Sequence, residues 1–457
     1  MSEITADIVV LGGGSAGYAT AIRAAELGKG VVLVERDKVG GTCLHRGCVP
    51  TKALLHVAEV VDTLAEAAHL GVSATLAGVD AARMQSFRRD VVAGKYKGLQ
   101  GLLAARGITV VAGDGRLDGP GRVSVGDDVF TAPHVVVATG AVTRALPGVE
   151  PGGRVLTSET ALELDAVPAS VVVLGGGVIG VEFASLWRSL GAEVTVVEAL
   201  PSLVPNEDET LRKGLERGFR KRGIQVCTGV RVAAVSQDDT SVTVTLDDGT
   251  SLDADQVLVA VGRAPATAGL GLEDAGVRLD RGFVVVDADL RTAVPGVWAV
   301  GDVVAGPQLA HRGFAHGILV AERIAGLSPV AAPEETIPRI TYSQPELAAV
   351  GLTREQAEAR FGADAVAVAD YNLAGNARSE ILGTAGSVRV IRRVDGPVVG
   401  VHMVGSRVGE LIAEAQLVVG WDAHPEDVAP FLHAHPTQSE ALGEAFLALA
   451  GKPLHTI

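Results

Sequence analysis

The apolar and polar positions of the chain form two kinds of pattern. Short, nearly continuous apolar runs alternate with stretches in which apolar residues recur at helical spacing. Continuous apolar runs of this length are typical of strands buried on both faces of a parallel sheet. Alternation of such strands with helices predicts an α/β fold. Two further segments, 123–130 and 242–252, alternate residue by residue and predict small antiparallel insertions.

One strand–turn–helix–strand pattern occurs twice. Residues 7–35 and 170–198 align without a gap. Each copy has an apolar run, a GxGxxG turn, a helical stretch ending in Leu-Gly, and a second apolar run ending in glutamate. The matching positions are Gly12, Gly14, Gly17 and Glu35 in the first copy and Gly175, Gly177, Gly180 and Glu198 in the second.

Each of these residue types has a physical role in dinucleotide binding. The first glycine allows the tight turn, the second lets the backbone approach a pyrophosphate, and the third lets helix and strand pack closely. The glutamate accepts hydrogen bonds from ribose hydroxyls. Because the complete pattern occurs twice, the sequence predicts two Rossmann-like dinucleotide-binding units. Each unit ends in another strand and glycine turn, at 134–140 and 256–262.

The pattern changes after about residue 335. Helical stretches such as 352–362 alternate there with strand-like runs such as 387–393 and 397–405, which predicts a separate α+β domain. Just before this change, segment 291–303 reads as a strand ending in Gly301-Asp302. Boundaries between domains are expected at proline- and glycine-containing stretches near 147–153, 263–271 and 328–338.

Two of the three cysteines, Cys43 and Cys48, lie in the stretch GGTCLHRGCVPTK at 40–52. In a regular helix, residues five apart are separated by about 7.5 Å along the axis, so a bond between them requires a bend. Gly40, Gly41, Gly47 and Pro50 allow one. These residues alone leave three interpretations open: a structural disulfide, a metal site that includes His45, or a redox-active pair. The third cysteine, Cys227, lies in an apparent strand and is expected to serve packing.

The composition limits the class of protein to which this chain can belong. The 457 residues suggest roughly three domains. A net charge of −15 argues against a nucleic-acid partner. Three cysteines exclude a secreted disulfide scaffold and favour a reducing, cytoplasmic compartment. The first strand begins too early to leave room for a signal peptide, and no apolar run approaches the roughly 18 residues of a membrane span.

Together these motifs resemble those of the flavoprotein disulfide reductases, and within that family the bacterial dihydrolipoamide dehydrogenases. The resemblance covers essentially the whole chain. It rests on GGTCLHRGCVPTK, both GxGxxG units, ATG at 138–140, VGD at 300–302 and HAHPTQSEAL at 433–442. It implies an FAD-binding domain at 1–147 and 269–335, an NAD-binding domain at 148–268, and a C-terminal dimerisation domain at 336–457.

The resemblance also implies cofactor contacts. FAD is expected at Gly12, Gly14, Gly17, Glu35, Lys52, Gly115, Thr139, Gly140, Asp302 and Ala310, and NAD at Gly175, Gly177, Gly180, Glu182, Glu198 and Gly262. Lys52 and Glu182 resemble the family's ion pair beside the flavin. Glu198 favours NAD over NADP, because a carboxylate accepts from the 2′-hydroxyl and repels a 2′-phosphate. Residues 199–209 contain no arginine or lysine that could receive such a phosphate.

The implied reaction is oxidation of protein-bound dihydrolipoamide with reduction of NAD⁺. Cys43 is expected to exchange with substrate and Cys48 to face the flavin, with His435 as acid–base oriented by Glu440. The family is homodimeric, so His435 is expected to serve the partner's disulfide, and the partner protein is a lipoyl domain. Two alternatives remain: a related disulfide or quinone reductase, and a docking subunit of a 2-oxo acid dehydrogenase complex. Departures from the family pattern occur at His45-Arg46 and at His316, and both could shift the flavin's potential.

Overall fold

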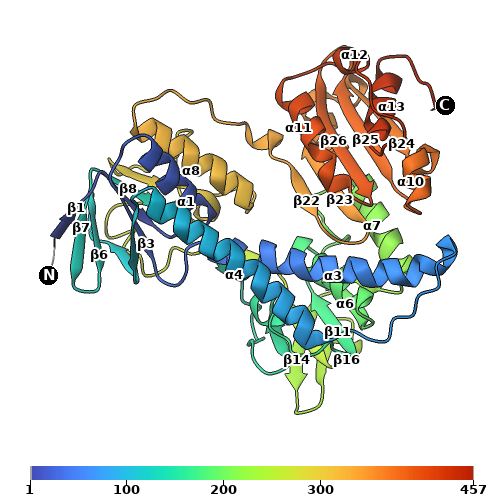
Figure 1. The fold of residues 1–457 in the computed structure, drawn as a ribbon, viewed down its shortest axis with the longest axis horizontal. Helices are drawn as coiled ribbons and strands as arrows, with labels where there is room; N and C mark the ends of the chain where they lie inside the picture. The colour runs from blue at the N-terminus through green and yellow to red at the C-terminus, as the bar shows by residue number, and fades with distance from the viewer. Residues whose placement is uncertain (1–2, 456–457) are drawn as a thin grey trace.

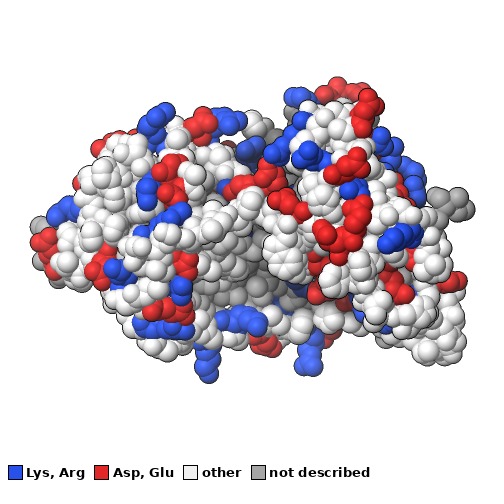
Figure 2. Space-filling view, turned by 90° about the horizontal axis from the view of Figure 1, so that it is seen from above, with Lys and Arg blue, Asp and Glu red and all other residues white. Residues whose placement is uncertain are grey.

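The computed structural model describes residues 3–455, which form three regions (Figure 1). The N-terminal region lies on the left of Figure 1, the second strand–helix unit lies below the centre, and the C-terminal region lies at the upper right. Seen from above, the surface is hollowed between the N-terminal and C-terminal lobes (Figure 2). No helix among residues 3–455 has both the length and the hydropathy needed to cross a membrane.

The first large sheet is parallel throughout, with strand order β21-β8-β2-β3-β4. Its strands are β2 (Ile8–Leu11), β3 (Val31–Glu35), β4 (Thr109–Ala112), β8 (His134–Val137) and β21 (Val297–Ala299). The central strands β2 and β8 are almost wholly buried, as their continuous apolar runs predict. Helices α1 (Ser15–Glu26) and α8 (Ala310–Ile324) pack so closely that a Cβ at Gly317 of α8 would overlap the backbone of α1.

The second large sheet repeats this arrangement, with order β10-β17-β11-β12-β13. Its strands are β10 (Val155–Thr157), β11 (Ser170–Leu174), β12 (Glu193–Glu198), β13 (Gln225–Thr228) and β17 (Gln256–Val259), with helices α5 (Ser158–Ala161), α6 (Val178–Ser189) and α7 (Glu209–Lys221). The two sheets differ at one edge. Strand β10 precedes its unit directly, whereas β21 of the first sheet comes after the whole second unit.

Smaller sheets accompany both units. One has order β1-β7-β6-β5, from β1 (Glu3–Thr5), β5 (Gly115–Leu117), β6 (Arg122–Val125) and β7 (Asp128–Thr131). The other is antiparallel, from β14 (Val232–Gln237), β15 (Val242–Leu246) and β16 (Ser251–Ala254). The β6–β7 and β15–β16 pairs confirm the predicted antiparallel insertions. Two-strand pairs join β9 (Ala141–Thr143) with β18 (Arg263–Pro265) and β19 (Leu279–Asp280) with β20 (Phe283–Val284).

The C-terminal region is an antiparallel sheet with order β22-β23-β26-β25-β24, which confirms the α+β expectation. Its strands are β22 (Arg339–Thr341), β23 (Glu346–Gly351), β24 (Val366–Asn372), β25 (Ser387–Arg393) and β26 (Val398–Gly405). Its helices are α9 (Arg354–Phe361), α10 (Ala377–Ile381), α11 (Ile412–Gly420), α12 (Pro425–Val428) and α13 (Glu440–Leu449). A separate core, which includes fully buried Phe446, holds this sheet and its helices together.

Two long helices, α3 (Cys48–Glu66) and α4 (Ala81–Ala105), connect the regions (Figure 1). Helix α3 runs from the cysteine loop along α6 of the second unit. Polar contacts secure both ends of this packing: Lys52 pairs with Glu182 at 2.6 Å, and Ser189 donates to Asp62 at 2.7 Å. The residues after Cys48 are therefore fixed by contacts with the second unit as well as by their own helix.

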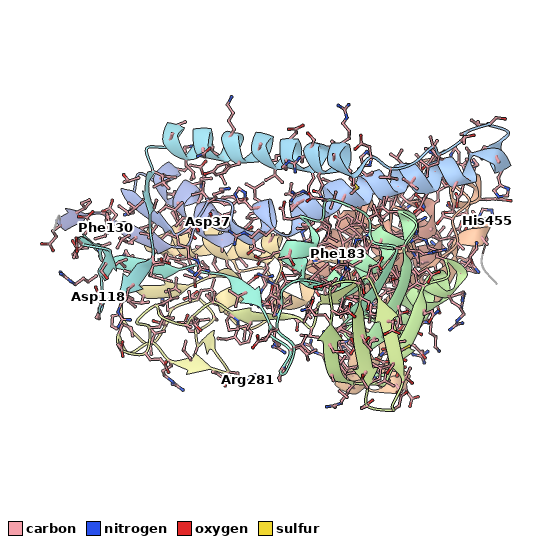
Figure 3. All side chains as sticks on the ribbon, turned by 90° about the horizontal axis from the view of Figure 1, so that it is seen from below. Asp37, Asp118, Phe130, Phe183, Arg281 and His455 are labelled. Carbon is pink, nitrogen blue, oxygen red and sulfur yellow. The ribbon has the colours of Figure 1, made fainter. Side chains whose placement is uncertain are left out.

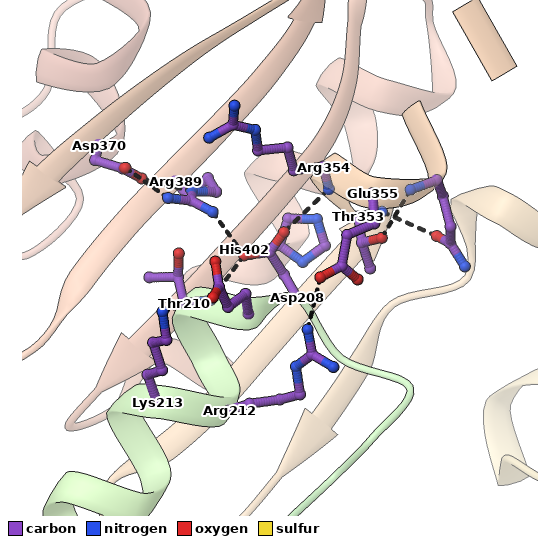
Figure 4. A network of polar contacts seen from close by, with 12 residues as sticks. Asp208, Thr210, Arg212, Lys213, Thr353, Arg354, Glu355, Asp370, Arg389 and His402 are labelled. Carbon is purple, nitrogen blue, oxygen red and sulfur yellow. Dashed lines mark hydrogen bonds and ion pairs between the residues drawn. The ribbon is translucent and has the colours of Figure 1, made fainter. Parts of the chain in front are cut away.

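A buried polar network joins the second unit to the C-terminal region (Figure 4). Asp208 is almost fully buried and caps α7 by accepting from the N–H of Thr210 at 2.9 Å. It also accepts from the N–H of Arg354 at 3.0 Å and from Nη1 of Arg389 at 3.0 Å, both in the C-terminal region. The neighbouring His402 is fully buried, and burial lowers its pKa. One carboxylate thus fixes the start of α7 against a helix, α9, and a strand, β25, of the C-terminal region.

Candidate functional site

A cavity of about 1850 Å³ lies between the regions and is lined by residues of all three. Its wall includes Asp37 of the first unit and Phe183 of α6, which Figure 3 labels. Sixteen of the residues that the sequence singled out line it: Gly12, Gly14, Glu35, Cys43, Cys48, Lys52, Gly115, Thr139, Gly140, Gly175, Gly177, Glu182, Glu198, Gly262, Asp302 and Ala310. Four lie outside its lining: Gly17, Gly180, His435 and Glu440.

The glycines of both units occupy equivalent positions. Gly12 and Gly175 have φ values of 100° and 110°, which side chains rarely adopt, and a Cβ there would collide with the backbone at Ala138 or Ala260. A Cβ at Gly17 or Gly180 would overlap the carbonyl of the first glycine of the same motif. Glycine is therefore required for the turn and for the close packing of helix on strand, as the sequence pattern predicts.

The two glutamates that end β3 and β12 are held in the same way. Glu35 Oε2 accepts from the N–H of Gly13 at 2.7 Å, and Glu198 Oε2 accepts from the N–H of Gly176 at 2.7 Å. The second oxygen of each accepts from the N–H two residues further on, at 2.9 Å and 2.8 Å. Both carboxylates are thus oriented at the cavity wall and keep lone pairs for further hydroxyl donors.

These features fit two dinucleotides. Helices α1 and α6 both begin at the cavity directly after Gly14 and Gly177, and a helix N-terminus attracts a pyrophosphate. No neighbouring atom lies within 4 Å of a Cβ built at Gly177, which leaves room for a ligand to approach the backbone. Asp302 follows β21 at the same cavity, and burial raises the pKa of its carboxyl, partly offset by Arg263, Arg312 and His316. Donors and acceptors for both ligands are therefore in place.

The cysteine stretch bends between two helices. Cys43 lies in α2 (Gly41–His45), and Cys48 is the first residue of α3. The break falls at Arg46 and Gly47, where Gly47 has φ −144° and ψ −112°. This confirms the bend that the sequence required. Both thiols are free in the structure and are in hydrogen-bond contact with each other.

The two thiols differ in acidity. The hydrogen bond with Cys43 and the positive charge of the Lys52 ammonium both lower the pKa of Cys48, whereas burial raises it. The lowering effects are larger, and the pKa of Cys48 is about 7. The same bond and burial raise the pKa of Cys43 well above its usual range, although Ser15 lowers it slightly. Cys48 is therefore the thiolate of the pair near neutral pH, and Cys43 is its proton-bearing donor.

The basic neighbours of the cysteines face other groups. His45 Nε2 contacts the carbonyl of Val39 at 2.9 Å, and its ring packs edge-on against Tyr96. Arg46 pairs with Asp37 and lies 3.8 Å from Glu159. The positive charge of Arg46 is thus already matched by carboxylates, so Lys52 is the cation that acts on Cys48.

Lys52 and Glu182 form the ion pair that the resemblance implied, and a third residue joins them. Glu182 Oε2 accepts from Lys52 Nζ at 2.6 Å, and its Oε1 accepts from the backbone N–H of Tyr342 at 2.9 Å. The Tyr342 ring also lies 4.8 Å from Lys52 Nζ in a cation–π arrangement. Tyr342 could not be predicted from the sequence, because any residue type except proline can supply a backbone N–H donor and Glu182 is 160 residues away.

His435 and Glu440 form a pair on the surface of the C-terminal region. His435 Nδ1 lies 2.8 Å from Glu440 Oε1, and the imidazole is 73% exposed. Burial opposes ionisation of Glu440, but hydrogen bonds from the N–H of Thr437 and from His435 lower its pKa. With Nδ1 bonded to this carboxylate, Nε2 is the ring nitrogen that can accept a proton. His433, two residues earlier, pairs instead with Glu414 at 2.8 Å.

Two remaining sequence candidates have clear positions. His316 Nδ1 accepts from the N–H of Gly301 at 3.3 Å, and its Nε2 lies 3.5 Å from Glu334. His316 therefore supports the backbone of the Gly301-Asp302 turn. Cys227 lies on β13, opposite Val197, and is half-buried. Burial raises the pKa of its thiol, in keeping with a packing role.

Comparisons with known proteins agree with this geometry. Residues 6–317 match the family of pyridine nucleotide-disulphide oxidoreductases, and residues 337–446 match the dimerisation domain of the same family. The chain is 38% identical to a dihydrolipoyl dehydrogenase of Bacillus subtilis, with 98% of this chain and 99% of that protein covered. It is 40% identical to dihydrolipoyl dehydrogenase 3 of Pseudomonas putida, with 97% and 98% covered.

Solved structures give the same result. LpdA from Mycobacterium tuberculosis superposes with a TM-score of 0.90 at 30% identity, covering 98% of this chain and 100% of that one. The HOCl-induced flavoprotein disulfide reductase RclA from Escherichia coli superposes with a TM-score of 0.86 at 28% identity, covering 96% and 99%. The chain therefore belongs to the pyridine nucleotide-disulphide oxidoreductases and is an FAD-dependent, NAD-linked member of that family.

Proposed function

We propose that this protein oxidises dihydrolipoamide, carried on a lipoyl domain, to lipoamide and reduces NAD⁺ to NADH. The observation that carries the proposal is the unequal thiol pair, Cys43 and Cys48, in a cavity flanked by two dinucleotide-binding units. Relatives named dihydrolipoyl dehydrogenase that match almost end to end support the choice of substrate. A cytoplasmic location belongs to the same proposal.

The reaction begins with Cys43 and Cys48 joined as a disulfide. His435 accepts a proton from one substrate thiol, and the resulting thiolate attacks the sulfur of Cys43. The Cys43–Cys48 bond breaks, and Cys48 leaves as a thiolate. The second substrate thiol then displaces Cys43 and closes the cyclic disulfide of lipoamide. The substrate loses two electrons and two protons, and the protein gains a dithiol.

The difference in acidity between the two thiols favours these separate roles for Cys43 and Cys48. The low pKa of Cys48 makes it the better leaving thiolate, because a more acidic thiol leaves faster. Once Cys48 has left as a thiolate, the raised pKa of Cys43 makes Cys43 the thiol that carries the proton of the reduced pair. A bound FAD would supply the two-electron chemistry that connects the dithiol to hydride transfer to NAD⁺, and the residues of this chain would hold it beside Cys48.

FAD is assigned to the first unit and NAD to the second. The cysteine stretch follows β3 of the first unit directly, and Cys48 faces the same cavity as Gly12, Gly14 and Glu35. In this assignment Thr139, Gly140, Gly115, Asp302 and the α8 N-terminus at Ala310 complete the FAD site, while Gly262, Glu182 and the glycines of the second unit hold NAD. Glu198, with its fixed orientation, gives the preference for NAD over NADP.

A homodimer completes the proposed site. His435 is exposed and does not line the cavity that contains Cys43. The C-terminal region matches a dimerisation domain, and exposed Trp421, Phe431 and Leu432 supply apolar surface there. A second copy would bring its own His435–Glu440 pair to the open side of the cysteine pair.

Steady-state turnover of the purified holoprotein tests the proposal. With dihydrolipoamide and NAD⁺ we expect kcat within the ordinary enzymatic range of about 1–10³ s⁻¹. Glutathione and small quinones, assayed in parallel, test the alternative that the protein is a related reductase. The structural similarity to the disulfide reductase RclA is the reason to test it. Faster turnover of those substrates than of dihydrolipoamide would overturn the proposed function.

A further inference from the structure

The Lys52–Glu182 pair and the Tyr342 ring beside it come from three different regions of the chain. Lys52 lies on α3 of the first unit and Glu182 on α6 of the second, and Tyr342 follows β22 of the C-terminal sheet. All three line the central cavity. Through Tyr342, the C-terminal region therefore contacts the two charged residues that act on Cys48. This contact is made within one chain and does not require a second copy.

The backbone at Tyr342 is fixed against the second unit. Its N–H donates to Glu182 at 2.9 Å, and two residues later the N–H of Gln344 donates to Ser185, one turn further along α6, at 2.8 Å. Pro345 then packs against Gly218 of α7 so closely that a Cβ at Gly218 would overlap its ring. These three contacts fix the backbone from which the Tyr342 ring projects.

The ring in turn restrains the Lys52 ammonium. The Lys52 side chain is 32% exposed and lines the cavity, and its ammonium has one carboxylate partner, Glu182. The face of the Tyr342 ring, 4.8 Å away, supplies a second attractive surface. Within residues 3–455 no hydrogen bond to the phenol oxygen is present. Burial, together with the carboxylates of Glu346 and Glu410, raises the pKa of the phenol, which stays neutral.

We propose that Tyr342 is a positioning residue that uses its aromatic face to hold the Lys52 ammonium beside Cys48. The role deepens the proposed function, because it concerns the same cysteine, but it depends on neither substrate nor NAD. The charged and titratable groups that act on Cys48 or surround it are Cys43 from α2, Lys52 from α3, Glu182 from α6, Tyr18 from α1 and Tyr342 itself. Among them Lys52 is the cation.

The test uses full-length holoprotein carrying Cys43→Ser and Cys227→Ser, in which Cys48 is the single thiol. The pH dependence of its alkylation by iodoacetamide reports the Cys48 thiolate. Adding Tyr342→Leu removes the ring but keeps the N–H donor to Glu182. We expect the apparent pKa to rise by about half a unit or more, because the ammonium is no longer held in place.

Three comparisons separate positioning from general loosening of the structure. Tyr342→Phe keeps the aromatic face and is expected to titrate as its parent does. Phe361→Leu removes a ring that packs against Arg360 and Arg393 elsewhere in the C-terminal region, and it is expected to change nothing. In a Lys52→Met background, Tyr342→Leu is expected to add no further shift.

The outcomes are decisive in either direction. Equal shifts for Tyr342→Phe and Tyr342→Leu, the same shift with and without Lys52, or no shift at all would each overturn the role. If Tyr342→Leu fails to fold, Tyr342→Met removes the ring with a flexible side chain of similar size and serves as the same test. Because turnover is not measured, failure of the proposed substrate leaves this result intact.

Discussion

At the scale of residues, the site depends on pairs of identical residue types with different surroundings. Cys43 and Cys48 differ in acidity because one donates to the other and because Lys52 stabilises Cys48. Glu35 and Glu198 accept from backbone donors at equivalent positions, Gly13 and Gly176, but they lie in different units that bind different ligands in the proposed function. The residue types could be identified from the sequence, whereas the difference in acidity between the two thiols depends on contacts that only the structure places.

The thiol pair gives a prediction with a defined sign. In reductant, Cys48 is expected to react as a thiolate above about pH 7 and to lose reactivity as the pH falls below that value. Cys43→Ser keeps a hydroxyl donor and is expected to leave this midpoint near 7, whereas Cys43→Ala removes the donor and raises it. The midpoint is measured from the rate of iodoacetamide alkylation in a Cys227→Ser background. Identical midpoints for the two variants would contradict the assigned donor.

Glu198→Arg tests the assignment of the second unit. The change removes an acceptor for the 2′-hydroxyl and the repulsion of a 2′-phosphate, so kcat/KM for NAD is expected to fall about tenfold or more relative to NADP. Glu193→Arg is the control, since it makes the same charge change at the opposite, exposed end of β12. An unchanged ratio in Glu198→Arg would remove Glu198 from nucleotide selection.

His435→Ala tests the proposed acid–base. Turnover of dihydrolipoamide is expected to fall by about 10²–10⁴-fold, while FAD content stays unchanged. The control is His455→Ala, because His455 also pairs with a glutamate of α13, Glu444, at 2.7 Å and is exposed. Near-normal turnover of His435→Ala, or an equal loss in His455→Ala, would exclude the assigned role.

At the scale of elements, the sequence predicts those features that depend on residues close together in the chain. The strand–turn–helix units, the bend after Cys43 and the small antiparallel insertions follow from glycine positions and apolar spacing within short segments. The 291–303 strand was also predicted, but its place at the edge of the first sheet beside β8 was not, because pairing across such a distance has no local pattern. Tyr342 was missed for the same reason.

Packing of α6 on β11 gives a prediction at this scale. A methyl group at Gly180 would overlap the carbonyl of Gly175, so Gly180→Ala is expected to destabilise the protein by about 1–3 kcal/mol and to weaken NAD binding. Gly98→Ala in α4 is the control, because no atom lies within 4 Å of a Cβ there and alanine favours helix. Urea unfolding followed by circular dichroism measures both. A loss in Gly98→Ala as large as that in Gly180→Ala would refute this account.

At the scale of the whole molecule, the regions are joined by buried polar contacts as well as by apolar cores. Burial opposes ionisation of Asp208, but the N–H of Arg354, His402, the N–H of Thr210 and Arg389 together lower its pKa. A carboxyl whose pKa is lowered by folding stabilises the folded state above its unfolded pKa, and this contribution is lost as the pH falls through the lower, folded value.

Asp208→Ala is therefore expected to cost about 3–5 kcal/mol at neutral pH, because it leaves Arg389 short of a buried partner and α7 without its cap. The deficit relative to the parent should shrink as the pH falls below about 4. Asp370→Ala removes the other, half-exposed partner of Arg389 and is expected to cost less than about 1 kcal/mol. Equal losses measured by urea unfolding would rule out Asp208 as the main connection.

Strand β21 reaches the first sheet late in the synthesis of the nascent chain. Its neighbour β8 ends at Val137, and β21 begins at Val297, after the whole second unit. At about 5–20 residues per second, the ribosome needs roughly 8–30 s to translate that interval. During this time the apolar edge of β8 has no partner, while the second unit can already fold with its own edge strand β10. The second nucleotide site can therefore form before the first, although the first begins the chain.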